Sequence, residues 1–210
     1  MKTWSDDNPK AGLMARKRAL LIDAALNAFL NTGYAESSVN CIAADAGVSI
    51  KTLYRHFQGK DELFSAVMQA ACTRTAGSEL PVWHSKPPPA GLRLAGEEYL
   101  RHTFSDEQLA LYRVVIRDAA RFPELGQRYR EEVIDRQQLL MISYLDRWQE
   151  DAGWKIKEKR DVAAVFAALL RAGIFERLLY DGVKPDDTSI VRRARGATQQ
   201  LVLLLDAGIL

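Results

Sequence analysis

Residues 38–57 read SVNCIAADAGVSIKTLYRHF, and this stretch decides the fold of the N-terminal part of the chain. Apolar residues recur at helical spacing from Val39 to Ala46 and again around Leu53 and Phe57, with Gly47 between the two runs. A serine precedes each run and is a suitable N-cap. Two short helices joined by a tight glycine turn must cross, which is the geometry of a helix-turn-helix motif. We therefore expect helices over residues 39–46 and 50–57.

The outward face of the second helix indicates what this motif binds. The expected core residues share apolar side chains and are Ile42, Ala43, Ala46, Val48, Leu53 and Phe57. The remaining positions carry cations, hydroxyls and an aromatic ring but no acidic group, and they are Ile50, Lys51, Thr52, Tyr54, Arg55 and His56. A solvent-facing helix normally mixes acidic and basic residues. A face without acids suits a helix that enters the major groove of DNA, where it meets phosphates and base edges.

The segments on either side of this motif also have helical periodicity. Apolar residues from Ile22 to Phe29 form a stripe in a helix expected over residues 16–32, and Gly33 ends it. Residues 1–15 are polar, and we expect a frayed N-terminal arm. A longer amphipathic helix begins at Lys60 and connects, over residues 61–76, to the rest of the chain.

Beyond residue 80 the chain reads as a second, larger helical bundle. Prolines between residues 81 and 89 interrupt any helix there. Further helices are expected near residues 91–104, 106–121, 124–150, 158–181 and 187–207. We therefore predict an all-α protein of about nine helices. A DNA-binding domain over residues 16–60 precedes a helical ligand-binding and dimerisation domain over residues 61–210.

Composition and charge exclude several classes of protein. The 210 residues are 48% hydrophobic and 27% charged, as in ordinary globular proteins, and the net charge is only +2. Residues 1–60 hold eight basic and five acidic residues, so any polyanionic partner is expected to meet this part. No apolar run has the length of a membrane span, and the N-terminus has no signal-peptide core. Two cysteines fit a reducing compartment, and we expect a cytoplasmic protein.

The motifs of the first 68 residues resemble those of a known family. Gly33-Tyr34, Ile42-Ala43, Ala46-Gly47-Val48-Ser49, the run from Thr52 to Phe57, Lys60 and Leu63 look like the DNA-binding domain of the TetR family of bacterial transcriptional regulators. The resemblance implies a homodimer that presents two such domains to a palindromic double-stranded DNA operator. It also implies a repressor that is released by a small-molecule effector bound in the C-terminal domain.

The resemblance further implies roles for individual side chains. Tyr54, His56 and Lys60 would hold phosphates, Ser38 would donate to a phosphate, and Thr52 would lie close to a base or phosphate. Lys51 would contact guanine or swing to the backbone. The full set of expected DNA-binding residues is Ser38, Ser49, Ile50, Lys51, Thr52, Tyr54, Arg55, His56 and Lys60. The alternatives are that Tyr54 packs on Leu63, that His56 is an interfacial histidine, and that the cations are solvated. The cluster from Arg16 to Arg18 is either a solvated helix start or a further backbone contact.

Residues of the C-terminal domain are expected to serve dimerisation and effector binding. The dimer interface is expected from two apolar stripes, formed by Ala163, Phe166, Ala167, Leu170 and Ile174 and by Val191, Ala194, Thr198, Leu201 and Leu205. The alternative is that a stripe faces the subunit's own core. Aromatic residues expected near an effector are Trp83, Tyr99, Phe104, Tyr112, Trp148 and Phe175, although each of them also suits an ordinary core.

No pattern in the sequence predicts an enzyme. The three histidines have no metal-binding spacing, and no phosphate-binding glycine loop or nucleophile elbow is present. We expect no catalytic residue, no metal and no cofactor. The alternative function is a helical ligand-binding or scaffolding protein that has lost operator recognition, and the acid-free face from Ile50 to His56 argues against it.

Overall fold

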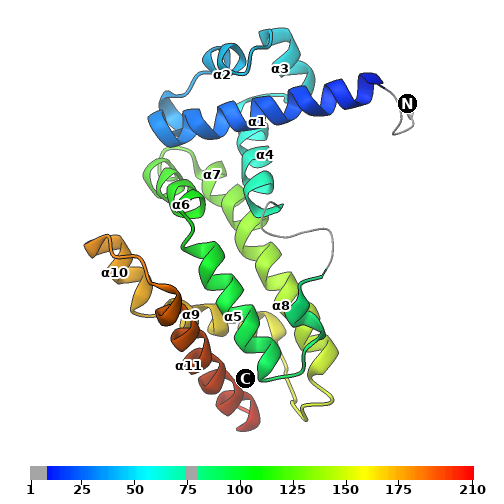
Figure 1. Ribbon diagram of the computed structural model, residues 1–210, viewed down its shortest axis with the longest axis vertical. Coiled ribbons are helices and arrows are strands. Elements are labelled where there is room, and N and C mark those ends of the chain that lie inside the picture. The colour runs from blue at the N-terminus through cyan, green and yellow to red at the C-terminus, as the bar shows by residue number, and fades with distance from the viewer. Residues whose placement is uncertain (1–8, 74–79) are drawn as a thin grey trace. The chain divides into compact units, whose positions relative to one another are not determined.

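The computed structural model describes residues 9–73 and 80–210, and these residues form helices without a strand (Figure 1). The all-α class predicted from the sequence is confirmed. The elements of the first part of the chain are α1 (Pro9–Glu36), α2 (Val39–Asp45), α3 (Ile50–His56) and α4 (Lys60–Thr73). They are followed by the 3-10 helix η1 (Val82–Ser85), α5 (Ala90–Thr103), α6 (Asp106–Asp118), α7 (Pro123–Tyr129) and the π-helix η2 (Arg130–Asp135). The last elements are α8 (Arg136–Trp148), α9 (Lys159–Arg171), α10 (Ile174–Asp181) and α11 (Asp187–Asp206).

One of the long helices expected from the sequence is divided in the structure. The segment expected as one helix over 158–181 breaks at Gly173, which has a φ of 73° and lies at the N-cap of α10. A left-handed residue cannot continue a right-handed helix, and glycine adopts this conformation at little cost. The segment expected over 124–150 stays helical from α7 through the π-helix η2 to α8.

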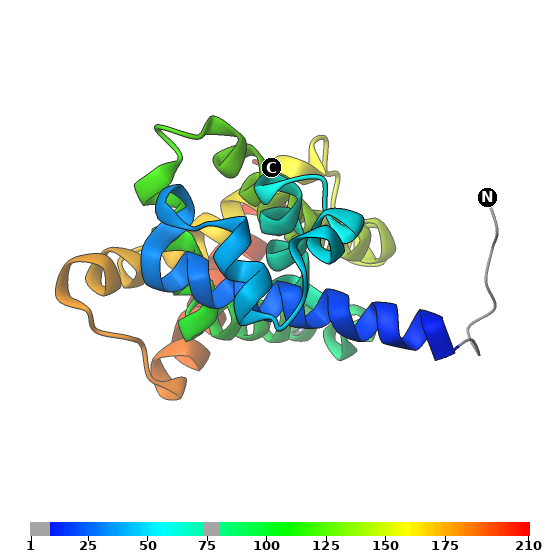
Figure 2. The same cartoon turned by 90° about the horizontal axis from the view of Figure 1, so that it is seen from above.

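The N-terminal helix begins earlier than expected. Helix α1 starts at Pro9, a residue that suits the first turn of a helix because its missing N–H has no partner to lose there. Residues 9–15 are helical and not frayed, which corrects the expectation for this part of the arm. Residues 1–8 lie outside the described residues. In Figure 2, the N-terminal turns of α1 extend beyond α2 and α3.

The chain forms two compact units, one made of residues 1–74 and 110–133 and the other of residues 75–109 and 134–210. The sequence placed the boundary at residue 60, whereas the contacts group α4 with the first unit. The reason is that Phe64, Val67 and Met68 of α4 are fully buried in the same core as Phe29 of α1. The Phe64 ring meets the Phe29 ring edge-on at 5.4 Å.

The core of the second unit forms where α5, α9 and α11 pack together. Gly96 permits the close approach, because a Cβ at this position would lie only 2.9 Å from the Leu170 side chain and 3.3 Å from Ala194 Cβ. The apolar stripes of α9 and α11 fill this core. Residues expected at a dimer interface are buried within their own subunit, and these are Ala163, Phe166, Leu170, Ala194, Thr198, Leu201 and Leu205. Ala167, Ile174 and Val191 are partly buried.

This burial corrects the interface expected from the sequence. An amphipathic helix must bury its apolar stripe somewhere, and in this chain the intrasubunit core takes the stripes of both helices.

Within residues 9–73 and 80–210, none of the helices combines the length and the apolar character that a membrane crossing requires.

Candidate nucleic-acid interface

The turn between α2 and α3 is fixed by local hydrogen bonds. The N–H of Thr52 donates to Ser49 Oγ at 3.2 Å, and the N–H of Asn40 donates to Ser38 Oγ at 3.3 Å. Both serines therefore act as the N-caps that the sequence predicts. Gly47, with a φ of 67°, makes the turn in a conformation that a side chain would strain.

The helix-turn-helix packs as predicted on one face of α3. Ile42 and Leu53 are fully buried, Phe57 is 2% exposed, and Ala43 and Ala46 belong to the same core. These contacts orient α3, because a seven-residue helix has little stability of its own and takes its position from the residues it buries. Ile50 is half-buried against this core and not freely exposed, so only part of its side chain is accessible.

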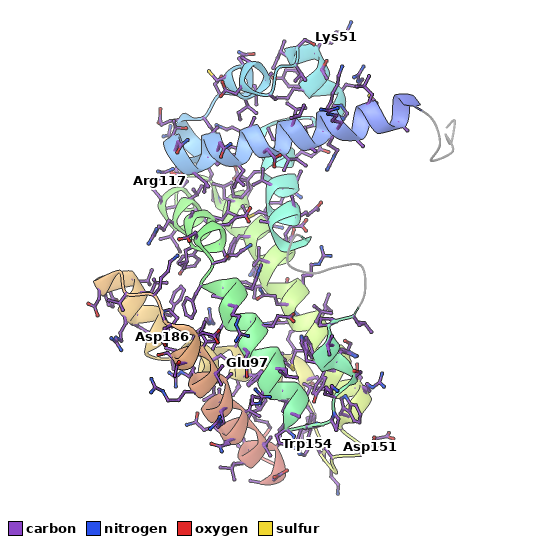
Figure 3. The ribbon with its side chains drawn as sticks, viewed as in Figure 1. Lys51, Glu97, Arg117, Asp151, Trp154 and Asp186 are labelled. Atoms are coloured by element: carbon purple, nitrogen blue, oxygen red, sulfur yellow. The ribbon has the colours of Figure 1, made fainter. Side chains whose placement is uncertain are left out.

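The opposite face of α3 is open. We call Lys51, Thr52, Tyr54 and Arg55 the reading face. Tyr54 is 55% exposed, Lys51 and Arg55 are exposed, and Thr52 is half-buried. Figure 3 shows Lys51 on the side of α3 that faces away from α1. Tyr54 has too much exposed surface for the alternative interpretation, in which its ring is covered by Leu63. No acidic residue lies between residues 50 and 56.

Arg18 of α1 also lies in this region, whereas the sequence left open whether the cluster from Arg16 to Arg18 was solvated or contacted the DNA backbone. The Arg18 guanidinium lies over the Phe57 ring, 5.2 Å from its centre, in a cation–π arrangement. This contact places Arg18 beside the C-terminal end of α3, where Arg55 is also exposed. The periodicity of the first helix offered no signal for this pairing, because the two residues are far apart in the sequence.

His56 lies at the buried edge of the reading face. Its Nε2 atom is buried and has no hydrogen-bond partner among the described residues. Burial lowers the pKa of His56, and the positive charges of Arg55, Arg18 and Lys17 lower it further. The imidazole is therefore neutral at neutral pH. His56 could meet a phosphate only as a neutral donor, and its buried Nε2 is not accessible in this conformation.

Lys60 has a different role from the one expected. Its Nζ donates to three backbone carbonyls, those of Tyr34 at 2.7 Å, Ser37 at 3.0 Å and Ala35 at 3.3 Å. An ammonium group has three donors, so these bonds occupy all of them. The same group lies 4.6 Å from the centre of the Tyr34 ring. Lys60 therefore binds the end of α1, and the structure corrects the expectation of a free cation for phosphate.

Asp118 completes this arrangement from the other side, and sequence reasoning missed it. Its Oδ2 accepts the N–H of Tyr34 at 2.8 Å and, more weakly, that of Ala35 at 3.4 Å. Burial raises the pKa of Asp118, but hydrogen bonds from Arg117, Tyr34 and Ala35 outweigh this effect and the net shift is downward. We call Tyr34, Lys60, Arg117 and Asp118 the α1 junction.

Gly33 makes the α1 junction possible. It interrupts the helical conformation of α1 with a φ of 88° and a ψ of 172°. A Cβ here would overlap the Arg117 guanidinium, whose nearest nitrogen would lie at 1.3 Å. The sequence predicts the helix break at Gly33, but not the arginine that approaches it.

Comparisons with known proteins identify the family. Residues 21–67 match the family of bacterial regulatory proteins named tetR, and residues 90–202 match the C-terminal domain of AefR-like transcriptional repressors. The second match alone covers more than half of the chain. The chain belongs to the TetR family. The resemblance found in the first 68 residues is thereby confirmed and extends to the C-terminal part.

Solved structures of TetR-family proteins share this fold. A protein from Mesorhizobium loti MAFF303099, described as a TetR-family transcriptional regulator, has a TM-score of 0.76 and 23% identity over 91% of this chain and 97% of that chain. The flavonoid-responsive regulator FrrA has a TM-score of 0.77 and 24% identity, covering 90% and 96%. FadR from Bacillus subtilis, solved with stearoyl-CoA, has a TM-score of 0.63 and 18% identity, covering 88% and 97%.

TetR-family proteins are DNA-binding transcriptional regulators and not enzymes, which agrees with the prediction from the sequence. In the part of the chain that the structure describes, no group of three or more His, Cys, Asp or Glu residues is placed to hold a metal ion.

The aromatic residues expected around an effector do not form one site. Tyr99 lines a cavity of about 140 Å3 between α5, α8 and α9, together with Gln137, Met141, Phe166 and Arg171. The other aromatic residues lie elsewhere. Trp83 and Trp148 each pack against Tyr144, Phe104 pairs with Phe175, and Tyr112 pairs with Tyr129 in the first unit. Most of these rings therefore lie in separate aromatic clusters, as the alternative of an ordinary core role expects, and Tyr99 alone of the six lines this cavity.

Proposed function

We propose that this TetR-family regulator is a homodimeric repressor that binds a palindromic operator and is released by a small molecule. The observation that carries the DNA-binding part is the reading face. Lys51, Tyr54 and Arg55 are exposed and Thr52 is half-buried, while the apolar side of the same helix is buried. A buried face that fixes the helix and an acid-free face that remains accessible are what insertion into the major groove needs.

Some reading-face residues would contact bases and others would contact phosphates. We assign base recognition to Lys51, whose ammonium can reach guanine O6 and N7 from the outer side of α3. Tyr54 and Arg55 would hold phosphates, and Arg18 would add a phosphate contact from α1. Each phosphate contact steepens the dependence of log affinity on log salt by about 0.9. The N-cap residues Ser38 and Ser49 are exposed, and Thr52 in the first turn of α3 is half-buried. Their hydroxyl groups can also reach the DNA backbone.

The proposed dimer would use the outer faces of α9 and α11. The apolar stripes are taken by the core, so the accessible face of α11 is the one that carries Arg192, Arg195, Gln199 and Leu203. Leu203 is 68% exposed, which is a large apolar surface for a helix of an isolated subunit. Pairing two subunits would place their reading faces in successive major grooves, with half-sites about 10 base pairs apart.

The proposed effector site is the cavity that Tyr99 lines. Its walls are mostly apolar, with Gln137, Gln138 and Arg171 as polar groups. Its volume of about 140 Å3 is below the roughly 300–1,000 Å3 usual for ligand sites. The effector is therefore either small or enters by widening the cavity, and an apolar molecule with one polar or anionic group fits these walls.

We propose that the protein acts in the cytoplasm, where its operator is found.

Selection of bound sites from a random duplex pool tests this function. We expect enrichment of one inverted repeat and a complex of two chains per site in gel shifts. A pool that returns no enriched sequence at low salt would contradict operator recognition and favour a ligand-binding or scaffolding protein. Repression is tested separately, by placing the selected site between a promoter and a reporter gene.

A further inference from the structure

The second unit contains a groove that is separate from the proposed effector cavity. It lies between the start of α10, the loop of residues 182–186 and α11, and it has a volume of about 590 Å3. None of its lining residues belongs to the cavity around Tyr99. We propose that this groove binds a small molecule that carries phosphate or several carboxylate groups, at a site separate from the proposed effector cavity.

The groove has an excess of positive charge. Four cations line it, and the only acidic residue among its lining residues is Asp186. The Nζ of Lys184 pairs with Asp106, so this charge is compensated. Within the described residues, Arg177, Arg192 and Arg193 form no ion pair. Three arginines against one carboxylate leave a net charge of about +2 that a dianion can neutralise.

Arg193 gives the most specific sign of a missing partner. Its Nε is buried and has no hydrogen-bond partner among the described residues. A buried charged donor without a partner is costly, and nearly all such groups in folded proteins are satisfied. Guanidinium groups bind the paired oxygens of carboxylate and phosphate with two parallel hydrogen bonds. Arg193 and Arg177, which both line the groove, therefore suit an oxyanion.

Two glycines keep the groove open. A Cβ placed on Gly196, in the middle of α11, would meet nothing within 4 Å. Gly173 begins α10 in the left-handed conformation, and a Cβ there would lie 3.7 Å from the Arg193 guanidinium. The space beside the arginines is thus made by missing side chains, and a larger residue at position 196 would fill it without disturbing the core.

The end of α11 does not itself supply the anion site. Asp186 caps this helix, accepting the N–H of Ser189 at 2.7 Å. Hydrogen bonds from Ser189 lower the pKa of Asp186, so its carboxylate stays ionised and repels an anion from the first turn. The ligand would instead lie on the arginine side of the groove, where Arg192 donates a 3.4 Å hydrogen bond to Ser189 Oγ.

Titration calorimetry on the full-length protein tests this site, with pyrophosphate and citrate as probes and sodium chloride at matched ionic strength as the blank. We expect one site per chain. The double variant Arg177→Gln/Arg193→Gln should weaken binding at least about tenfold, because charge-assisted bonds are lost. The matched control is Arg136→Gln, an exposed arginine of α8 that lies outside the groove and is not on the proposed dimer face, which should change the affinity less than twofold.

A second variant keeps every charge and removes the space. Gly196→Leu should weaken both probes by a factor similar to that of the double variant, while the melting temperature without anion is retained or raised. A preference for pyrophosphate would indicate a phosphorylated ligand, and a preference for citrate would indicate a polycarboxylate.

Three results would overturn the proposal. The first is equal binding of the probes to the wild type and both groove variants, and the second is an equal loss in Arg136→Gln. The third is a shift in the dimerisation constant of the double variant, measured by sedimentation, without a change in anion affinity. That result would assign the groove to contacts between subunits. Operator binding without anion is measured in the same variants and should be unchanged, so that a failure here is distinct from a failure of the proposed function.

Discussion

The reading face and the α1 junction lie in the same compact unit and use the same types of side chain in opposite ways. On the reading face, Lys51 and Arg55 are exposed, and residues 50–56 of α3 include no acidic residue. At the junction, Lys60 gives all of its donors to backbone carbonyls, and Asp118 accepts two backbone N–H groups and an arginine. A charge that is satisfied within the subunit contributes to stability, whereas an accessible one is available to a partner. The two regions should therefore respond to substitution in different measurements.

Replacing Asp118 should have the largest effect on stability. Asp118→Ala leaves the buried N–H of Tyr34 without an acceptor and removes the partner of Arg117. We expect the free energy of unfolding to fall by about 3 kcal/mol, measured by urea denaturation. The matched control is Glu98→Ala, an exposed carboxylate of α5, which should change it by less than about 0.5 kcal/mol. Equal effects of the two variants would mean that Asp118 is not a structural acceptor.

Lys60→Met distinguishes a structural lysine from a phosphate-binding one. The change keeps the aliphatic stem and removes three hydrogen bonds, so the free energy of unfolding should fall by about 2 kcal/mol. The salt dependence of operator binding, measured where the variant is folded, should keep its slope. A stable variant whose slope falls by about 0.9 would instead restore the phosphate role expected from the sequence.

Lys51→Ala should change sequence preference and leave stability unaltered. Because Lys51 is exposed, its loss should cost less than about 0.5 kcal/mol of folding free energy. Discrimination at one or two base pairs should fall by roughly 1–2 kcal/mol, measured on a library of operator variants. A uniform loss of affinity across that library would show that Lys51 contacts the backbone and does not read bases.

Tyr54→Phe removes only a hydroxyl from the reading face. We expect operator affinity to fall by about 1 kcal/mol, equally for all operator variants, because one phosphate bond is lost. The melting temperature should not change, since the ring is 55% exposed and keeps its packing. Unchanged affinity for DNA would place Tyr54 outside the complex.

The smallest effect should come from the titration of His56. Burial and nearby cations lower its pKa in the folded state, so the unfolded chain binds a proton more readily. The stability that depends on neutral His56 is therefore present above about pH 6.5 and is lost as the pH falls through the folded-state pKa. His84 and His102 shift in the same direction. His56→Gln should therefore make the acid-side decline shallower without abolishing it, in unfolding curves from pH 8 to pH 5.

The sequence predicts correctly those features that depend on interactions between residues close together in the chain. The caps at Ser38 and Ser49, the turn at Gly47 and the buried Leu53 all lie within twenty residues, and periodicity locates them correctly. The role of Lys60 depends on carbonyls that lie more than twenty residues earlier in the chain, in a segment that also bonds to Asp118. The family motif therefore predicts a positive charge at this position but not its partners.

The sequence could not assign C-terminal side chains to a core or to a site, for a related reason. A stripe such as Ala194, Leu201 and Leu205 shows that one side of a helix is buried, but does not say whether the partner is another helix of the same subunit or a second copy. The aromatic residues are similarly ambiguous, because ring clusters such as Trp83 with Tyr144 arise in any helical core. Gly173 lies inside an apolar run, where periodicity alone continues the helix through it.

The positive-φ conformation of Gly33 has a consequence for how this chain can vary. Because the chain turns out of the helix there, the carbonyls of Tyr34, Ala35 and Ser37 converge on one ammonium group. A side chain at position 33 would strain that turn and so weaken these hydrogen bonds. A single achiral residue thus decides whether a positive charge stays inside the subunit or becomes available at the surface, so mutational drift at this position would change stability and polyanion affinity together.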